Sequence, residues 1–232
     1  NETALEEYLS FQYSVLPESF FKGVYKLLPA HYFLYQDGDL KVTRYWTPEF
    51  EPKEDKPLDE WVDEIEKTFD NSVQAHKIAD VEVGCFLSSG VDSSYVACSA
   101  GVDKTFTVGF SQEKYNEIHY AQELSDLIGV ENIHQVITPE EFWSTFPNIQ
   151  YHMDEPLADP SAVALYFVCK LASQHLKVVL SGEGADEIFG GYNVYREPIE
   201  HTAYDHIPFP IRRLIGQIAQ KLPPRRGHNF LV

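Results

Sequence analysis

The feature that most constrains the fold is a small-residue loop between an apolar run and a helix-compatible segment. Residues 81–87 are largely apolar, residues 88–94 read Ser-Ser-Gly-Val-Asp-Ser-Ser, and residues 95–98 can continue a helix. Such a strand–loop–helix unit is suited to anions, because the N–H groups and dipole of the helix start favour negative charge. Asp92 fits beside phosphate only if Mg²⁺ lies between them, held by carboxylate and phosphate oxygens.

The loop also has a plainer interpretation, which is a Ser/Gly turn between a buried strand and a helix. It is not a Walker A motif, because no Gly-Lys-Ser or Gly-Lys-Thr sequence follows. It is not a dinucleotide fingerprint either, because the glycine spacing is absent. A second segment is needed to favour the anion site over the turn.

The second segment repeats this arrangement near the other end of the chain. Residues 177–180 predict a short strand, and residues 181–192 read Ser-Gly-Glu-Gly-Ala-Asp-Glu-Ile-Phe-Gly-Gly-Tyr. Ligands of open α/β sheets lie outside the carboxyl ends of parallel strands. We therefore expect both loops, with their carboxylates, to face one crevice. The alternative is an acidic surface loop with a glycine helix stop.

The predicted fold class is α/β, a parallel sheet with helices on both faces, because strands and helices alternate along the chain. Strands are expected near residues 83–87, 105–110, 133–137 and 178–181, and helices near residues 58–76, 93–99, 117–128, 139–151, 162–174 and 184–189. A helix at 3–13 and a β-hairpin at 32–45, turning at 36–39, precede this part.

Three regions are predicted along the chain. Residues 1–50 form an N-terminal helix and hairpin segment, and a Pro- and charge-rich linker at 48–57 follows. Residues 58–195 form the core of the domain. Residues 196–232 form a C-terminal segment, whose basic residues at 212–213 and 221–226 we expect in a solvated tail.

Composition excludes several function classes. The net charge of −18 over 232 residues argues against a nucleic-acid surface and an anionic membrane face. No apolar stretch is long enough to span a membrane and no signal peptide opens the chain. Cys85, Cys98 and Cys169 show neither metal-ligand nor disulfide spacing. We expect buried free thiols, as suits a cytoplasmic protein.

Several ordered motifs resemble one enzyme family. Residues 87–94 resemble the pyrophosphatase loop of ATP-using amide-forming enzymes, and residues 181–192 resemble a signature of glutamine-dependent asparagine synthetases. Segments 23–32, 44–46, 105–110 and 154–161 agree with that family. The chain is thus similar, from near its start to about Tyr195, to the synthetase domain of the glutamine-hydrolysing asparagine synthetases. That implies a PP-loop fold, like that of the adenine nucleotide α-hydrolases.

The resemblance implies an ATP-dependent ligase. Such domains adenylate the side-chain carboxylate of aspartate, release pyrophosphate, and let ammonia displace AMP to give asparagine. ATP and Mg²⁺ are the implied cofactors. Ammonia would come from a glutaminase domain that is absent here, since the chain starts at Asn1 without the family's N-terminal Cys. The full-length enzyme is a possible homodimer, and we expect this piece to be incomplete for catalysis.

The resemblance also assigns roles to residues. The implied ATP-binding residues are Leu87, Ser88, Ser89, Gly90, Ser93, Ser94, Val108, Ser181 and Gly182. Among them, Leu87 and Val108 match backbone contacts to adenine, the loop residues match contacts to pyrophosphate, and Ser181 and Gly182 match the ribose and α-phosphate region. Asp92 and Asp186 would hold Mg²⁺. Glu183, with Asp92, is the implied catalytic residue, acting as the base that deprotonates ammonium.

Two departures from the family pattern leave alternatives open. Ser89 stands where the family usually has Gly, and a positive φ there would strain the loop by about 1 kcal/mol or more; Glu82 stands where Pro is common. One alternative keeps the chemistry with another acid, as in β-lactam synthetases and peptide-cyclising relatives. The other is a nucleotide-binding module without catalysis, which Ser89 alone supports. In the loop at 154–161, a substrate role and helix capping by Ser161 are both expected.

Overall fold

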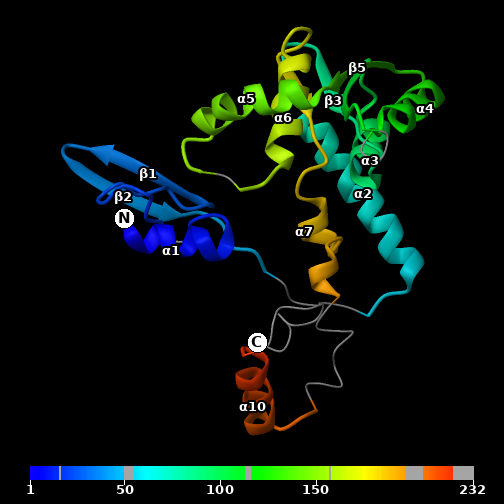
Figure 1. The fold of residues 1–232 in the computed structure, drawn as a ribbon. Coiled ribbons are helices and arrows are strands. Elements are labelled where there is room, and N and C mark those ends of the chain that lie inside the picture. The colour runs from blue at the N-terminus through cyan, green and yellow to red at the C-terminus, as the bar shows by residue number, and fades with distance from the viewer. Residues whose placement is uncertain (16, 50–54, 113–115, 157, 197–205, 222–232) are drawn as a thin grey trace. The chain divides into compact units, whose positions relative to one another are not determined.

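The computed structural model describes residues 1–15, 17–49, 55–112, 116–156, 158–196 and 206–221. The chain divides into two compact units, Asn1–Gly182 and Glu183–Val232, and each is described by itself. The first unit contains the predicted parallel sheet (Figure 1). The three regions predicted from the sequence, 1–50, 58–195 and 196–232, remain predictions.

Four parallel strands form this sheet in the order β5-β4-β3-β6. The strands are β3 (Val83–Phe86), β4 (Lys104–Phe110), β5 (Glu131–Ile137) and β6 (Val178–Leu180). Strand β4 pairs with β5 along its whole length, but its register with β3 ends at Phe86↔Phe106. The segment of β4 after Phe106 therefore extends past the end of β3, at the carboxyl edge where ligands of such sheets lie.

Helices cover both faces of the sheet, as predicted. One face packs against α2 (Leu58–His76), α3 (Val91–Ala100) and α4 (Ile118–Ile128), through a cluster that includes Cys85, Leu87, Val96 and Ala121. The other face packs against α5 (Pro139–His152) and α6 (Ser161–Ala172), through clusters around Phe106 and Ile137. Alternate residues of β3 and β4 point to opposite faces, so neither strand has a solvated side.

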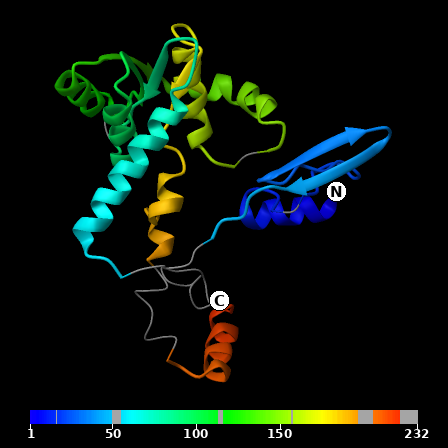
Figure 2. The same ribbon diagram turned by 180° about the vertical axis from the view of Figure 1, so that it is seen from behind.

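Helix α2 confirms the prediction at 58–76, and Figure 2 shows it in cyan from behind. The C-terminal part of its apolar face packs into the core, where Val73 is buried and Phe69 packs against the same cluster. Two hydrogen bonds join it to α3, from Gln74 to the Ser99 carbonyl at 3.0 Å and from Ser99 to Asp70 at 2.5 Å. The helix thus supports α3, which carries the predicted anion loop.

The N-terminal helix and hairpin are also confirmed. Helix α1 spans Glu2–Phe11, and strands β1 (His31–Gln36) and β2 (Asp39–Arg44) pair antiparallel. Asp37 and Gly38 have φ of 53° and 91°, which is the type I′ geometry that matches the twist of a two-residue hairpin. The predicted linker at 48–57 lies partly outside the described residues.

The second unit contains α7 (Ala185–Phe189), the 3₁₀ turn η2 (Asn193–Tyr195) and α10 (Phe209–Ala219). Helix α10 corrects the expectation of a solvated tail at Arg212 and Arg213. Its apolar residues at 211, 214, 215, 218 and 219 follow helical spacing, and Ala219 is buried. Arg213 is exposed, whereas Arg212 is half-buried on the side of the helix that carries Ala219; residues 222–226 lie outside the described residues.

Two cysteines correct the expectation of buried thiols. Cys85 is fully buried in β3, whereas Cys98 and Cys169 are exposed. Both exposed thiols lie on helices whose neighbouring positions, such as Ala97 and Val168, take the core-facing side. Apolar neighbours in sequence therefore do not bury a helical residue, because only one side of the helix meets the sheet. Of the helices in the described ranges, none combines the length and apolarity that crossing a membrane needs.

Candidate functional site

The loop from β3 to α3 leaves the sheet at a buried residue and ends at an open helix start. Leu87 is 3% exposed, and its N–H donates to the Phe106 carbonyl at 2.9 Å. Gly90 is the N-cap of α3, with φ −71° and ψ 148°, and it offers no side-chain cap. The N–H groups of residues 91–93 have no carbonyl partner within the helix, so they and the helix dipole form an anion-binding end.

The serine hydroxyls hold the shape of this loop. Ser93 Oγ accepts from the Ser88 N–H at 3.1 Å and lies 2.9 Å from Ser88 Oγ. Ser94 Oγ donates to the Gly90 carbonyl at 2.7 Å. The Gly90 N–H donates to Ser88 Oγ at 3.1 Å. The hydroxyls tie the loop to itself, and the backbone N–H groups are left as the main donors for an anion.

Ser89 does not strain the loop. Among the residues the structure describes, the non-glycine positions with positive φ are Gln12, Ala30, Asp37 and Asp154. Ser89 is not one of them, so its side chain carries no left-handed penalty. Its N–H donates to Glu117 Oε2 at 3.3 Å. Glu117, which precedes α4, is a neighbour of the loop that sequence reasoning missed.

Gly182 joins the second segment to the first loop within the first unit. A Cβ at Gly182 would lie 2.8 Å from the Ser93 nitrogen and 3.0 Å from the Asp92 carbonyl carbon. Only a glycine permits this approach, because backbone atoms cannot move aside as the end of a flexible side chain does. Strand β6, which pairs with β3 up to Cys85↔Leu180, delivers residues 181 and 182 to this place. The structure thus brings Ser181 and Gly182 to the start of α3.

The acids of the second segment belong to the second unit. Gly184 is the N-cap of α7 with φ 94°, and Asp186 lies in the first turn of that helix. Gly191 donates its N–H to the Asp186 carbonyl at 2.9 Å, and a Cβ at Gly191 would overlap the Asp186 carboxylate. Glu183 is exposed and Asp186 half-buried. The shared metal site of Asp92 and Asp186 stays a prediction, as does the role of Glu183.

Tyr192 reports the negative potential around these acids. Its hydroxyl donates to Glu187 Oε1 at 3.1 Å. That hydrogen bond, with partial desolvation and the charges of Glu187, Asp186 and Glu183, raises the pKa of Tyr192 above its ordinary value. In the described part of the chain, these acids included, no three His, Cys, Asp or Glu side chains gather closely enough to hold a metal by themselves. A cation held by Asp186 would therefore need further ligands, such as phosphate oxygens.

Leu87 directly follows β3, and Val108 lies in the neighbouring strand β4, so both lie at the carboxyl edge. Phe106 accepts from Leu87, so its carbonyl points toward β3. Val108 lies two residues further along β4, and its N–H and C=O point the same way. Because β3 ends at Phe86, both groups of Val108 lie beyond the paired part of β3. One donor and one acceptor on a single residue can recognise the edge of a base.

The loop at 154–161 is tied down by charged side chains. Lys26 forms an ion pair with Glu155 at 3.2 Å and also donates to the Ser14 carbonyl at 3.1 Å. Asp159 Oδ1 accepts from the Ser161 N–H at 2.9 Å. Ser161 does not cap α6, because it is the first helical residue and Pro160 is the N-cap; Asp159, one residue earlier, accepts from the first N–H of the helix. The substrate role of this loop stays a prediction.

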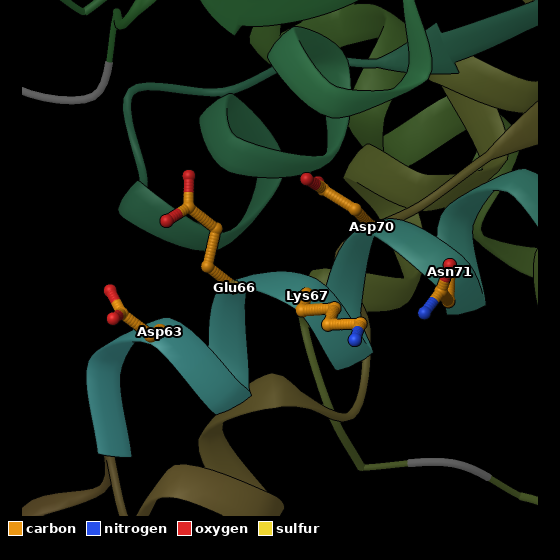
Figure 3. Close-up of a pocket in the computed structure, with 5 residues that line it drawn as sticks. All are labelled: Asp63, Glu66, Lys67, Asp70 and Asn71. Carbon is orange, nitrogen blue, oxygen red and sulfur yellow. The ribbon is translucent and has the colours of Figure 1, made fainter. Parts of the chain in front are cut away.

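A shallow hollow of about 490 Å³ lies on α2 and contains none of the predicted site residues. Figure 3 shows its lining side chains, which are Asp63, Glu66, Lys67, Asp70 and Asn71. Three of these five are acidic and all come from one helix, which is typical of a solvated helix surface. The carboxyl edge of the sheet remains the candidate site.

Comparison with known proteins assigns the chain to a class and then to a family. The strand–loop–helix unit and the edge-facing backbone are typical of α/β domains that bind ligands at the carboxyl edge of a parallel sheet. The family model for asparagine synthase matches residues 64–229, and the chain belongs to the asparagine synthase family.

Curated relatives agree with this assignment. Asparagine synthetase (glutamine-hydrolyzing) 1 of Bacillus subtilis is 40% identical over 100% of this chain and 37% of its own length. Asparagine synthetase (glutamine-hydrolyzing) 3 of the same organism is 30% identical over 83% of this chain and 34% of its own length. Amidase chyE of Penicillium rubens is 31% identical over 77% of this chain and 30% of its own length. The chain thus spans about a third of the length of these relatives.

Proposed function

We propose that the chain forms the ATP-binding and carboxylate-activating part of an amide-forming ligase, with aspartate as the acid and ammonia as the nucleophile. The observation that carries this proposal is the approach of Gly182 to the start of α3, where a Cβ would lie only 2.8 Å from the Ser93 nitrogen. That contact joins two segments which both fit a nucleotide, and the family of the chain supports the reaction.

The residues of the first unit bind and orient the nucleotide. The N–H groups of residues 91–93 bind the oxygens of the pyrophosphate portion, and Ser88, Ser93 and Ser94 keep these donors in position. The backbone of Leu87 and Val108 holds the adenine. Ser181 and Gly182 contact the ribose and the α-phosphate. Positioned donors of this kind stabilise the charge that builds on the departing pyrophosphate.

The donor set fits Mg²⁺. Asp92 lies in the first turn of α3, beside the anion-binding end, and a carboxylate there would repel phosphate unless a cation separates them. Asp186 supplies the second carboxylate of the proposed site, and Gly191 gives that carboxylate its space. When bound, Mg²⁺ supplies charge neutralisation at the pyrophosphate oxygens.

Activation and amide formation follow as two displacements. A carboxylate oxygen of aspartate attacks the α-phosphorus of ATP, and the bond to pyrophosphate breaks. Ammonia then attacks the acyl carbon, the carbon–oxygen bond to AMP breaks, and the nitrogen releases one proton to solvent. Glu183 accepts a proton from ammonium before that attack. A glutaminase part of the full-length protein supplies the ammonia, and the reaction takes place in the cytoplasm.

Pyrophosphate exchange into ATP tests the proposal, because exchange requires the first displacement but no ammonia. The full-length protein is assayed with aspartate and with other carboxylic acids, first with Mg²⁺ and then after its removal. Exchange that needs both aspartate and Mg²⁺ supports the proposal. Exchange with a different acid supports a relative with another substrate. A well-folded protein that exchanges with no acid supports a module without catalysis.

Asp92→Asn sharpens the same assay. We expect this change to abolish exchange and leave the circular dichroism spectrum and melting temperature close to those of the wild type, because Asp92 is half-buried at a helix start and not in the core. Glu183→Gln serves as the partner variant. It should retain exchange and lose amide formation, because the proton of ammonium is needed only in the second displacement.

A further inference from the structure

A line of buried hydroxyl groups runs across the sheet beneath the base-recognising edge. Thr105 is 0% exposed, Thr107 2% and Ser125 0%. Thr105 Oγ1 lies 3.1 Å from Ser125 Oγ, and Asn132 Nδ2 donates to Thr105 Oγ1 at 3.0 Å and to Thr107 Oγ1 at 2.9 Å. Buried polar groups are costly unless each has a partner, so this network has a structural reason or a functional one.

The network ends on a residue of the candidate site. Thr107 Oγ1 donates to the Leu87 carbonyl at 2.8 Å. The hydroxyl must be the donor, because a carbonyl oxygen can only accept. The amide N–H of Asn132 donates to the same Thr107 Oγ1 and so does not compete for the hydroxyl proton. Of the described hydroxyls in this network, Thr107 alone reaches Leu87.

The bond from Thr107 replaces one that the parallel ladder would otherwise make. With Phe86 opposite Phe106, the next ladder bond would run from the Val108 N–H to the Leu87 carbonyl. The backbone bonds of the described residues include Leu87 N–H to Phe106 O but none from Val108 to Leu87. The Thr107 hydroxyl therefore satisfies the Leu87 carbonyl, and the Val108 N–H stays available at the edge.

We infer that Thr107, oriented by Asn132, is a positioning residue that makes the site selective for adenine. This inference rests on the proposed function. The free N–H and C=O of Val108 match the acceptor N1 and the donor N6 amino group of adenine. Guanine presents a donor at N1 and an acceptor at O6, so it meets donor with donor and acceptor with acceptor. Without the Thr107 hydroxyl, the Val108 N–H turns to Leu87 and this selectivity is lost.

The chain offers a matched control for the test. Thr107→Val and Thr105→Val each remove one buried hydroxyl from the same strand, but only the first removes a bond to Leu87. Thr107→Ser keeps the hydroxyl. Calorimetric titration of the full-length protein measures dissociation constants for magnesium ATP, magnesium GTP and magnesium pyrophosphate. Amide hydrogen exchange by NMR follows the Val108 N–H without any nucleotide.

We expect Thr107→Val to raise the dissociation constant for magnesium ATP about tenfold, which is the effect of losing about one hydrogen bond. Pyrophosphate binding should stay within about twofold, since pyrophosphate has no base, and the preference for ATP over GTP should shrink. Protection of the Val108 amide should rise about tenfold as it joins the ladder. Thr105→Val and Thr107→Ser should resemble the wild type in all four readouts.

Three results would overturn the inference. Equal losses of ATP binding in Thr107→Val and Thr105→Val would reduce the network to a structural role. If Thr107→Val binds ATP and pyrophosphate with equal losses of affinity, the effect lies in the phosphate loop and not at the base. If the hydrogen-exchange rate of the Val108 amide is unchanged, Thr107 does not control that N–H. A wild-type protein that binds neither ATP nor pyrophosphate contradicts the proposed function itself, and the exchange experiment then still decides whether Thr107 controls Val108.

Discussion

The two loops of the candidate site reach their shapes by different means. The loop at 87–94 is held by serine hydroxyls and contains no residue with positive φ among its described positions. The segment at 181–192 depends on glycine, with φ of 94° at Gly184 and 69° at Gly190 and close approaches at Gly182 and Gly191. Hydrogen bonds of the serine side chains hold the first loop. The second segment keeps its shape because glycine has no side chain to clash at the close approaches.

This difference predicts how each loop tolerates substitution. Removing the Ser94 hydroxyl costs one hydrogen bond, and removing that of Ser88 or Ser93 costs two or more. In each case the remaining bonds keep the backbone near its place. A methyl group added to the second segment meets backbone or a carboxylate and displaces what the segment positions. We therefore expect larger losses from single methyl groups at 182 and 191 than from single hydroxyls at 88–94.

Gly182→Ala is expected to have the largest effect. The new methyl would lie 2.8 Å from the Ser93 nitrogen, so the second segment must move away from α3. A displacement of this order at a catalytic site can cost about 100-fold in rate, and we expect that loss in pyrophosphate exchange. Gly90→Ala is the control, because its methyl would meet two side-chain hydroxyls, Ser88 at 3.2 Å and Ser93 at 4.0 Å, and no backbone atom. Similar losses in both variants would end the contrast between the loops.

Gly191→Ala tests the second segment away from the first unit. Its methyl would take the space of the Asp186 carboxylate. We expect the affinity for magnesium ATP to fall about tenfold, because changing a residue that positions a metal ligand typically has an effect of this size. Binding of ATP in the presence of EDTA should be unchanged. If calorimetry finds the same loss with and without Mg²⁺, Asp186 is not a metal ligand.

Ser94→Ala should have a smaller effect. It removes the hydroxyl that donates to the Gly90 carbonyl at 2.7 Å, and a typical hydrogen bond contributes about 0.5–1.5 kcal/mol. We expect pyrophosphate to bind about fivefold more weakly. Ser94→Thr keeps the donor and should bind like the wild type. A loss of 100-fold in Ser94→Ala would mean that this hydroxyl contacts the ligand directly.

Ser89→Gly should bring no gain, although glycine is the usual residue at this position in the family. Ser89 has an ordinary φ, so glycine relieves no strain and adds freedom to the unfolded chain. We expect the free energy of unfolding to fall by roughly 0.4–1 kcal/mol and nucleotide affinity to stay within about twofold. Denaturant titration and calorimetry measure both. A more stable variant would show that Ser89 strains the loop.

Tyr192 gives the smallest signal, which depends on pH. Its pKa is raised because its hydroxyl donates to Glu187 and the nearby carboxylates oppose a second negative charge. The neutral form is favoured by folding, so this contribution to stability is present below the ordinary pKa and is lost as pH rises through the folded one. The pKa of Tyr95 is also raised, by desolvation and by the charges of Asp70 and Glu66. Absorbance titration at alkaline pH should therefore show late-ionising tyrosines, of which one is lost in Tyr192→Phe. An unchanged titration curve would contradict the contact with Glu187.

Local patterns predicted the repeating part of the fold. The alternation of apolar strands with amphipathic helices specified the parallel sheet, and the stripe of α2 fixed its bounds. The Asp37-Gly38 pair specified the hairpin turn, because few other residues accept two positive φ values. Such features depend on neighbours in sequence, so they can be read from the chain alone.

Features that depend on distant contacts could not be predicted in this way. Glu117 meets Ser89 only because β4 and α4 place it there. The exposure of Cys98 depends on which side of α3 meets the sheet. Helix α10 was not predicted because the basic pair was given more weight than the helical spacing of the apolar residues around it. One signal for the polar network was present, since Thr105 and Thr107 alternate within an otherwise apolar buried strand.

The most direct test is a crystal structure of the full-length protein with Mg²⁺ and a non-hydrolysable ATP analogue. The account predicts one metal ion bound by the carboxylates of both Asp92 and Asp186, with the terminal phosphates against the N–H groups of residues 91–93. A nucleotide bound away from the start of α3, or a metal that Asp186 does not contact, would contradict it.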